Sequence, residues 1–523
     1  MIRNIGFTVS SFCCLMYAPL LFAIESEKPE AGVTVLSRGP IHEAFAQPTT
    51  APPDPAPEVP KAPPDPIPEE PPDQKPEGAN VQWIPGYWSW DGDKKDWLWV
   101  SGFWRNTPPG RQWVPGHWVK ADDGWRWVAG FWASAARREI NYQDAPPASL
   151  ENGPASAAPD DESIYIPGVW VYRDGRFLWR PGYWLTCRPG WTWSAAHYVW
   201  TPRGYVYVDG YWDYPLEDRG CLFAPVVFNE PLWTTPGWCY RPRFVLNVGS
   251  LWDCLFVRAG WNSYCFGDYY GPAWAKLGFS PWFTFGTHCH DPLYGYYGWA
   301  NRNNSHWATD LRATHDGRVN GDLSRPPTTF AAQTAGKTST SLVTPLAQVA
   351  SVGKAKITTL NSNQLADHTR SVSQFRDLAG QRAKTESSQG TVKTSALQLP
   401  GHGSADPAGG RSAEPAGRSA VIKSSGPVSN HQSGPTITTS QTPTIQSGSG
   451  PVVHTSQSPV IHSSPPATNF HPSPAPIHVA PLGGGGRGGG FGGGGHWGGG
   501  GGHGGGGGHG GGGHGGGGHG GHR

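Results

Sequence analysis

The sequence predicts a mainly β protein, in which antiparallel meander repeats of about 14 residues form two small sheets with a tryptophan core. Long disordered regions are expected at both ends of the chain. All but one of the 27 Trp lie between Trp83 and Trp307, and within that stretch an aromatic-x-x-Gly-x-aromatic motif recurs at a fixed step. The rest of the chain holds most of the 74 Gly and 53 Pro, a composition that does not build a core.

The N-terminus has the composition of an export signal. Arg3 gives a positive start, residues 5–24 are mostly apolar and uncharged, and Ala23 is a small residue at a plausible cleavage point. We therefore expect residues 1–24 to be a signal peptide, and the protein to be exported to the periplasm, the cell surface or the medium. Retention as a membrane anchor is the alternative. No transmembrane span is expected once the signal is removed.

Residues 25–80 are predicted to be a Pro-rich acidic linker. Residues 46–80 carry seven acidic and two basic side chains, and Pro-Pro-Asp-Pro occurs twice there. Such a run favours polyproline II, so a stiff spacer is expected. Docking of this run into an aromatic groove is the alternative.

Eight copies of the motif fall into two blocks, residues 81–132 and 163–213, joined by a linker at 133–162. Alternating aromatic residues before each glycine predict a strand, and Asp-Gly pairs after the second aromatic predict hairpin turns. Each block is therefore expected to be a four-stranded meander, and the two blocks to stack through their tryptophan faces. The motif residues are Trp83, Gly86, Trp88, Trp99, Gly102, Trp104, Trp113, Gly116, Trp118, Trp127, Gly130, Trp132, Gly168, Trp170, Trp179, Gly182, Trp184, Gly210 and Trp212.

The central glycine of the motif is expected to mark a β-bulge. Trp99 and Trp104 are five residues apart and would face opposite ways on a regular strand, so one extra residue at Gly102 would bring them to one face. The proline that precedes four of these glycines fits a bulge, because it removes a donor from the ladder. A type II turn at Pro-Gly is the alternative.

The motif resembles the WXXGXW, or YXWGXW, repeat of bacterial exported proteins. The resemblance covers residues 83–212, and the copy at 193–198 departs from it, with Ala196 in place of Gly and Tyr198 in place of Trp. It implies an envelope or secreted protein and carries no catalytic residue to this chain.

Residues 214–309 form an aromatic, cysteine-containing region that is expected to pack on the repeats as a cap. Six cysteines remain after removal of the signal, and an even number in an exported chain predicts disulfides whose pairing the sequence does not define. Metal binding at residues 288–290, which read His-Cys-His, is the alternative. The disulfide candidates are Cys187, Cys221, Cys239, Cys254, Cys265 and Cys289.

Residues 310–482 are rich in Ser, Thr and Pro and are predicted to be a disordered stalk, with a possible helix at 362–386 where Leu365, Val372 and Leu378 share a face. Residues 483–523 are a Gly/His-rich tail. Its histidines are a candidate site for Zn, Cu or Ni, and a mobile tail without metal is the alternative. They are His496, His503, His509, His514, His519 and His522.

No catalytic signature is present, so we expect no enzyme activity and no cofactor. The net charge of +1 argues against a nucleic-acid partner. We expect a structural, scaffolding or adhesive role in the cell envelope or outside the cell. A glycan-binding module with aromatic surfaces is the alternative, as is metal sequestration by the tail. Candidate partners are envelope polysaccharide and other surface proteins.

Overall fold

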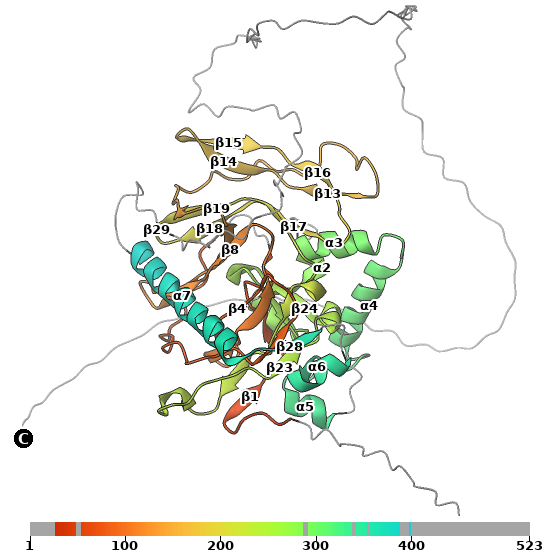
Figure 1. The fold of residues 1–523 in the computed structure, drawn as a ribbon. Coiled ribbons are helices and arrows are strands. Elements are labelled where there is room, and N and C mark those ends of the chain that lie inside the picture. The colour runs from red at the N-terminus through yellow and green to blue at the C-terminus, as the bar shows by residue number, and fades with distance from the viewer. Residues whose placement is uncertain are drawn as a thin grey trace, which may run out of the picture. The chain divides into compact units, whose positions relative to one another are not determined.

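The computed structural model describes residues 27–48, 54–285, 291–336, 341–352, 356–387 and 397–398. These residues form a mainly β fold of many short antiparallel strands with a few helices, as the sequence predicts (Figure 1). The predicted signal peptide, most of the predicted stalk and the Gly/His-rich tail lie outside the described residues. None of the described helices is long and apolar enough to cross a membrane.

The eight motif copies form four two-stranded hairpins, and each hairpin is made by two consecutive copies. We call residues 81–106 hairpin 1, 111–134 hairpin 2, 163–186 hairpin 3 and 192–213 hairpin 4. Each hairpin has an inner and an outer pair of strands, such as β5–β6 and β4–β7 in hairpin 1. The strands are β4 Val81–Ile84, β5 Tyr87–Asp91, β6 Asp96–Val100, β7 Phe103–Asn106, β8 Arg111–Val114, β9 His117–Lys120, β10 Trp125–Val128, β11 Phe131–Ser134, β13 Ser163–Ile166, β14 Val169–Arg173, β15 Arg176–Arg180, β16 Tyr183–Thr186, β17 Thr192–Ser194, β18 His197–Thr201, β19 Gly204–Val208 and β20 Tyr211–Asp213.

The expected four-stranded meanders are therefore wrong. In every hairpin the ladder stops at the motif glycine and resumes beyond it, with two residues omitted from each strand. In hairpin 1, Ile84 pairs with Phe103 and the next pair is Tyr87 with Val100. Because the interruption is equal on both strands, it is neither a bulge, which adds a residue to one strand only, nor a turn. The Asp-Gly turn was predicted correctly at Asp174-Gly175, where both residues have positive φ.

The hairpins stack on one another in the order 1, 2, 4, 3 (Figure 1). Trp118 of hairpin 2 donates its indole N–H to the carbonyl of Trp88 in hairpin 1, at 2.9 Å. At the equivalent position, the Tyr198 hydroxyl of hairpin 4 donates to the carbonyl of Trp170 in hairpin 3, at 3.0 Å. Arg111 of hairpin 2 joins these two pairs, because it donates to the carbonyl of Gly210 at 2.8 Å. The blocks thus meet through hairpins 2 and 4, not as two sheets face to face.

The segment predicted to be a stiff spacer is packed against the repeats. Ile67 is fully buried, and Val59 pairs with Trp125 through an isolated bridge. The N-terminal strands also join the body, since β1 pairs with β22 and β2 pairs with β25. This segment is not a spacer, because its backbone carbonyls accept hydrogen bonds from the indoles of hairpin 1. The strands of this segment are β1 Val33–Val35, β2 Gly39–Pro40 and β3 Gln74–Pro76, and β12 Glu139–Ile140 lies in the linker between the two blocks.

Residues 214–309 pack on hairpin 1 and share its hydrophobic core. Val226 pairs with Trp99, and Cys221 pairs with Trp104. A second sheet, in the order β2-β25-β24-β26, lies beside this contact. The strands are β21 Gly220–Cys221, β22 Val226–Phe228, β23 Phe244–Leu246, β24 Leu255–Arg258, β25 Ser263–Phe266 and β26 Phe279–Pro281. The short 3₁₀ helices are η1 Leu216–Asp218, η2 Leu232–Thr234, η3 Val248–Ser250, η4 Trp252–Cys254 and η5 Ala259–Trp261.

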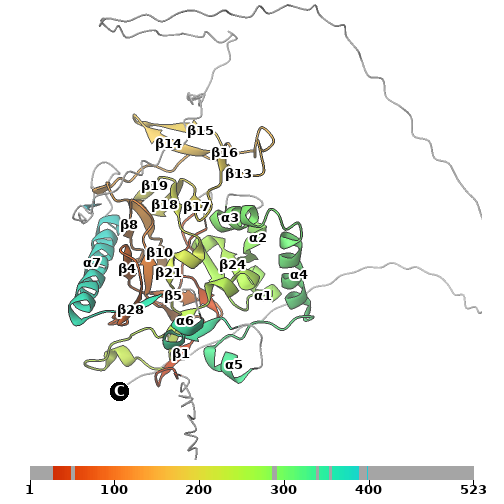
Figure 2. The same ribbon diagram turned by 45° about the vertical axis from the view of Figure 1, so that its right-hand side comes forward.

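Ordered structure continues well past residue 310, where a disordered stalk was predicted (Figure 2). Leu311, Phe330 and Leu346 are buried in the main core, so a few widely spaced apolar residues suffice to fix these elements. The helix predicted at 362–386 is α7, and it crosses hairpins 1 and 2. The helices are α1 Pro272–Lys276, α2 Trp282–Phe285, α3 Pro292–Ala300, α4 Trp307–Asn320, α5 Phe330–Ala335, α6 Leu346–Val352 and α7 Ser362–Ser387. The remaining strands are β27 Val343–Pro345, β28 Ile357–Thr359 and β29 Leu397–Gln398.

Candidate functional site

The motif aromatics pair across each hairpin, edge to face in hairpins 1, 3 and 4 and at a tilted angle in hairpin 2. The first aromatic of one copy lies opposite the last aromatic of the other, so that Trp83 faces Trp104 with ring centroids 5.1 Å apart. The same pairing joins Trp113 to Trp132 at 5.2 Å. Offset and edge-to-face contacts at this distance are the favoured geometry of indole pairs. Further pairs are Trp88–Trp99, Trp118–Trp127, Tyr165–Trp184, Trp170–Trp179, Trp193–Trp212 and Tyr198–Tyr207.

The motif glycines are needed because a ring lies directly over them. A Cβ built on Gly130 would lie 2.4 Å from Cζ2 of Trp113, and one on Gly116 would lie 2.3 Å from Cζ2 of Trp127. Gly86 has no room either, since its Cβ would lie 2.3 Å from the carbonyl oxygen of Val100. None of these glycines has a positive φ. Space, not backbone angle, selects glycine here, which corrects the reason given from the sequence.

A buried glutamate closes the interruption in hairpin 1. Glu69, which is 3% exposed, accepts the backbone N–H of Gly86 at 2.7 Å and that of Gly102 at 2.8 Å. Its carboxylate also accepts the indole N–H of Trp99 at 2.9 Å. Two glycine N–H groups leave the ladder and bond to one carboxylate together with a motif indole. We call this arrangement a carboxylate clamp.

Hairpin 2 has the same clamp, made by a different glutamate. Glu43 accepts the backbone N–H of Gly116 at 3.2 Å and of Gly130 at 3.1 Å, and the indole N–H of Trp127 at 3.1 Å. Trp127 holds the same place in hairpin 2 as Trp99 holds in hairpin 1. The acid comes from the N-terminal segment, far from the hairpin in sequence.

Hairpin 3 has a partial clamp, in which a glutamate accepts the N–H of one motif glycine instead of two. Glu151 accepts the backbone N–H of Gly168 at 2.5 Å and the hydroxyl of Tyr165 at 2.8 Å. Tyr165 is the first aromatic of the first copy in hairpin 3, the place that Trp83 holds in hairpin 1, whereas the clamp indoles Trp99 and Trp127 belong to second copies. Hairpin 4 differs more, because Ala196 replaces one glycine and no described acid contacts the backbone N–H of Ala196 or Gly210.

The segments that carry these acids act as straps across the hairpins. Trp88 donates to the carbonyl of Asp65 and Trp104 to that of Gln74, so both ends of hairpin 1 bond to the strap that holds Glu69. In hairpin 3, Trp170 donates to the carbonyl of Ala148 and Trp184 to the hydroxyl of Ser156, on either side of Glu151. Each linker thus binds the indoles of the hairpin that follows it.

A family model described as the WXXGXW repeat, in two copies, matches residues 79–105, 113–133, 164–184 and 188–214. The chain carries WXXGXW repeats. Each matched segment coincides with one hairpin, so the two copies of the family model correspond to the two arms of a hairpin. No curated protein and no solved structure matches the chain.

The acids of the first two WXXGXW clamps, Glu43 and Glu69, are buried. Burial raises the pKa of Glu43 to about 7, partly offset by its hydrogen bonds to Gly130 and Trp127 and by the charge of Arg382. Burial also raises the pKa of Glu69, offset by the N–H groups of the clamp and by Arg376. Helix α7 supplies both arginines, so it brings one cation toward each of the first two clamps.

Arg382 is the most buried of these cations, with no exposed surface. It donates to the carbonyls of Pro115 and Ala129, the residues just before the two glycines of hairpin 2, at 2.9 Å each. At this interruption Glu43 therefore accepts hydrogen bonds from the backbone N–H groups, and Arg382 donates hydrogen bonds to the backbone carbonyls. Glu386, also buried, pairs with Arg382 at 2.7 Å.

His42, next to Glu43 in the chain, plays a similar part in hairpin 1. Its Nε2 lies 3.0 Å from the carbonyl of Pro85, and its Nδ1 accepts the N–H of Ala44 at 3.1 Å. These partners require the neutral tautomer with hydrogen on Nε2. Burial lowers the pKa of His42 to about 3, which keeps the ring neutral.

The disulfide prediction is not supported for the described cysteines. Cys187, Cys221, Cys239, Cys254 and Cys265 are free thiols, and Cys289 lies outside the described residues. Four of the five are buried among apolar side chains in separate places, for example Cys221 opposite Trp104 and Cys265 opposite Phe256. Burial raises the pKa of Cys221, Cys254 and Cys265 to about 12, so these thiols are unreactive.

In the part of the chain that the structure describes, no group of three His, Cys, Asp or Glu side chains is placed to bind a metal ion. The His-Cys-His run at 288–290 and the six tail histidines lie outside that part. The clamp acids were not predicted from the sequence, because they stand in segments that the sequence assigns as linkers. One signal was present: Glu69 precedes Gly86 by 17 residues, and Glu151 precedes Gly168 by the same 17.

Proposed function

We propose that this chain is a non-enzymatic, exported structural protein whose stacked WXXGXW hairpins serve as a scaffold or adhesive module in the cell envelope or outside the cell. The observation that carries the proposal is the use of the motif itself. The Trp and Gly residues of hairpins 1 and 2 are taken up by ring pairs and carboxylate clamps. Because these motif residues make contacts that stabilise the fold, they support a structural role rather than a catalytic one.

Export is proposed from the composition of residues 1–24, which have the pattern of a signal peptide. Envelope polysaccharide and other surface proteins are the proposed partners. Metal sequestration by the Gly/His-rich tail remains a separate prediction. Calorimetry with Zn²⁺ on the full chain and on a chain ending at residue 482 tests it, and equal uptake by both would remove the idea.

Cell fractionation tests the main proposal. The full chain and a chain lacking residues 1–24 are expressed in the same bacterial host, and each fraction is probed for the protein. The full chain is expected in the envelope or the medium, and the shortened chain in the cytoplasm. Recovery of the full chain in the cytoplasm would contradict export and with it the envelope role.

A further inference from the structure

The second inner strand of a WXXGXW hairpin is paired along its outer edge in hairpins 1, 2 and 4. In hairpin 2, Trp125 of β10 exchanges two backbone hydrogen bonds of 2.8 Å with Val59. In hairpin 4, Tyr205 of β19 does the same with Gln143, again at 2.8 Å. In hairpin 1, β6 pairs with β22. A segment distant in sequence thus adds a short strand to each of these hairpins.

Hairpin 3 lacks such an added strand. Phe177 of β15 stands two residues before a motif aromatic, Trp179, as Trp125 and Tyr205 do in their own hairpins. The two residues that flank the two-residue turn form a hydrogen-bonded pair, so alternation directs the backbone N–H and C=O groups of Phe177 and Trp179 away from β14. No residue that the structure describes pairs with this edge of β15. An unpaired edge is a template for the addition of a strand.

The segment added to hairpin 2 shows which chemistry such an edge accepts. It is followed by Pro60, and its Val59 is only 2% exposed. The neighbouring Glu58 pairs with Arg126 of β10 and accepts the backbone N–H of Asp123 at 3.2 Å. The added strand is therefore held by backbone hydrogen bonds, one buried apolar side chain and one acid that bonds to a basic residue of the hairpin.

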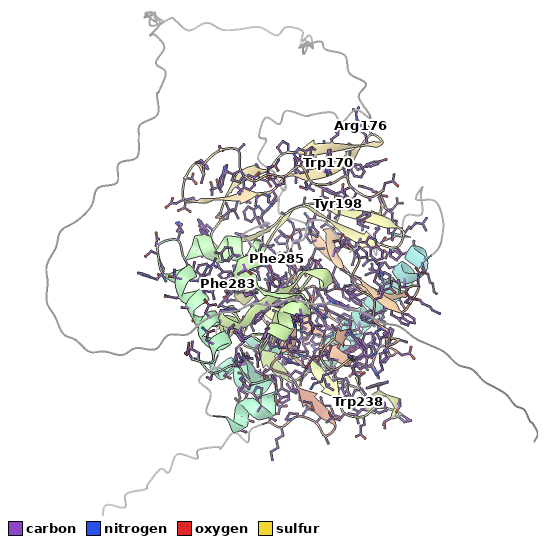
Figure 3. The ribbon with its side chains drawn as sticks, turned by 180° about the vertical axis from the view of Figure 1, so that it is seen from behind. Trp170, Arg176, Tyr198, Trp238, Phe283 and Phe285 are labelled. Atoms are coloured by element: carbon purple, nitrogen blue, oxygen red, sulfur yellow. The ribbon has the colours of Figure 1, made fainter. Side chains whose placement is uncertain are left out.

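The hairpin that contains β15 is basic. Strands β14 and β15 carry three arginines and no acid, and Asp174 in their turn leaves a net charge of +2. Two of these arginines, Arg173 and Arg176, are exposed and form no ion pair with a described residue. Figure 3 shows Arg176 at the tip of hairpin 3. A second copy of β15 is a poor match for this edge, because pairing through both outward residues places Arg176 opposite Arg180 of that copy, and like charges opposite one another are destabilising.

We propose that the outer edge of β15 binds an extended acidic segment of another protein as an added antiparallel strand. The backbone groups of Phe177 and Trp179 pair with the added strand, and one of its apolar side chains packs beside the half-buried ring of Phe177. The acids of the segment lie against Arg173 and Arg176. The inference rests on the proposed adhesive role and defines the chemistry of the protein partner.

A peptide with the sequence of residues 54–64 is the probe, because it contains the segment that hairpin 2 accepts. Calorimetry with the purified full chain is expected to show binding. N-methylation of Val59 in the peptide removes one backbone donor, and Glu58→Lys in the peptide reverses one charge. Each change is expected to weaken binding about tenfold or more. Absence of binding, or equal binding of either altered peptide, overturns the proposal.

Variants of the chain and hydrogen exchange assign the binding to β15. The double variant Arg173→Glu, Arg176→Glu is expected to weaken peptide binding about tenfold or more, whereas Arg138→Glu, at an exposed position before hairpin 3, leaves it unchanged. In the unaltered chain, the peptide is expected to slow exchange at the N–H groups of Phe177 and Trp179. Slower exchange only elsewhere refutes the site, and a dimer of the chain that the peptide dissociates refutes the partner. Because purified protein is used, failure of this test is distinguishable from failure of the export test.

Discussion

At Gly130 the ring of Trp113 leaves no space for any side chain. A Cβ there would lie 2.4 Å from Cζ2 of that ring and 2.7 Å from the carboxylate of Glu43. Replacement of Gly130 by alanine therefore displaces both the Trp113 ring and the Glu43 carboxylate. The same relation holds at Gly116 with Trp127. The glycine of one WXXGXW copy thus contacts the first tryptophan of the other copy in the same hairpin.

We expect Gly130→Ala to lower the free energy of unfolding by about 3 kcal/mol, because overpacking and a strained clamp act at once. Gly249→Ala is the matched control, since no atom lies within 4 Å of its Cβ and its φ is not positive. The control is expected to change stability by no more than about 0.5 kcal/mol. Urea denaturation measures both, and equal effects would contradict the steric account.

Glu69 offers a second test at a single residue. Glu69→Gln keeps the shape but turns one accepting oxygen into an N–H donor that faces other N–H donors. We expect a loss of about 3 kcal/mol in urea denaturation, since a buried hydrogen bond to a charged group is broken. Glu70→Gln, which removes only the partly exposed pair with Arg241, is expected to cost less than about 1 kcal/mol. A larger effect at Glu70 than at Glu69 would refute the clamp.

Among the secondary-structure elements, local sequence patterns predict the hairpin turns and α7. They do not predict the distant contacts that stabilise these elements. Alternating aromatics and Asp-Gly pairs act within a few residues, so β14, β15 and their turn follow from sequence. The acceptors of the glycine N–H groups come from distant segments, 17 residues away for Glu69 and 87 for Glu43. No local pattern marks such a partner, and the proline-rich sequence around Glu69 is typical of a stiff spacer.

Helix α7 shows the same dependence on distant partners. Its apolar face is short, with Val372 and Leu378 buried, and its last turns instead bury Arg382 and Glu386. Arg382 bonds the carbonyls left free by the interruption in hairpin 2. The helix therefore completes hairpin 2 rather than merely covering it.

We expect Arg382→Met to lower the free energy of unfolding by about 3–5 kcal/mol, since it leaves Glu386 buried without its cation. Adding Glu386→Gln should recover part of that loss, because the stranded charge is removed. Arg370→Met, on the exposed side of α7, is expected to change stability by less than about 0.5 kcal/mol. A double-mutant cycle in urea measures the coupling, and strict additivity would show that the two residues do not act as a pair.

For the whole molecule, buried acids make stability depend on pH in an unusual direction. The pKa of Glu43 is raised by burial from 4.5 to about 7, and that of Asp291 from 3.8 to about 6. An acid whose pKa is higher in the folded state binds its proton more tightly there, so its contribution is complete below the unfolded pKa and is lost as pH rises through the folded one. His42 acts in the opposite sense, because its lowered pKa removes stability as pH falls below 6.5.

Glu43→Gln is expected to flatten the fall in stability between pH 4.5 and pH 7. The difference between wild type and variant should change by up to about 3 kcal/mol across that window and stay constant above and below it. Urea denaturation at half-unit pH steps provides the curve. A difference that does not vary with pH would show that folding does not raise the pKa of Glu43.

The extent of the folding unit follows from the same contacts. Aromatic density alone predicts a stable core at about residues 80–305, but that piece lacks Glu43, Glu69 and Arg382, which bond the interruptions of hairpins 1 and 2. Without them, buried N–H and carbonyl groups remain unpaired, at about 1–3 kcal/mol each. We expect a chain of residues 27–398 to unfold in one cooperative urea transition, and a chain of residues 80–305 to show none. A cooperative transition in the shorter chain would mean that the straps and α7 are additions to a body already stable without them.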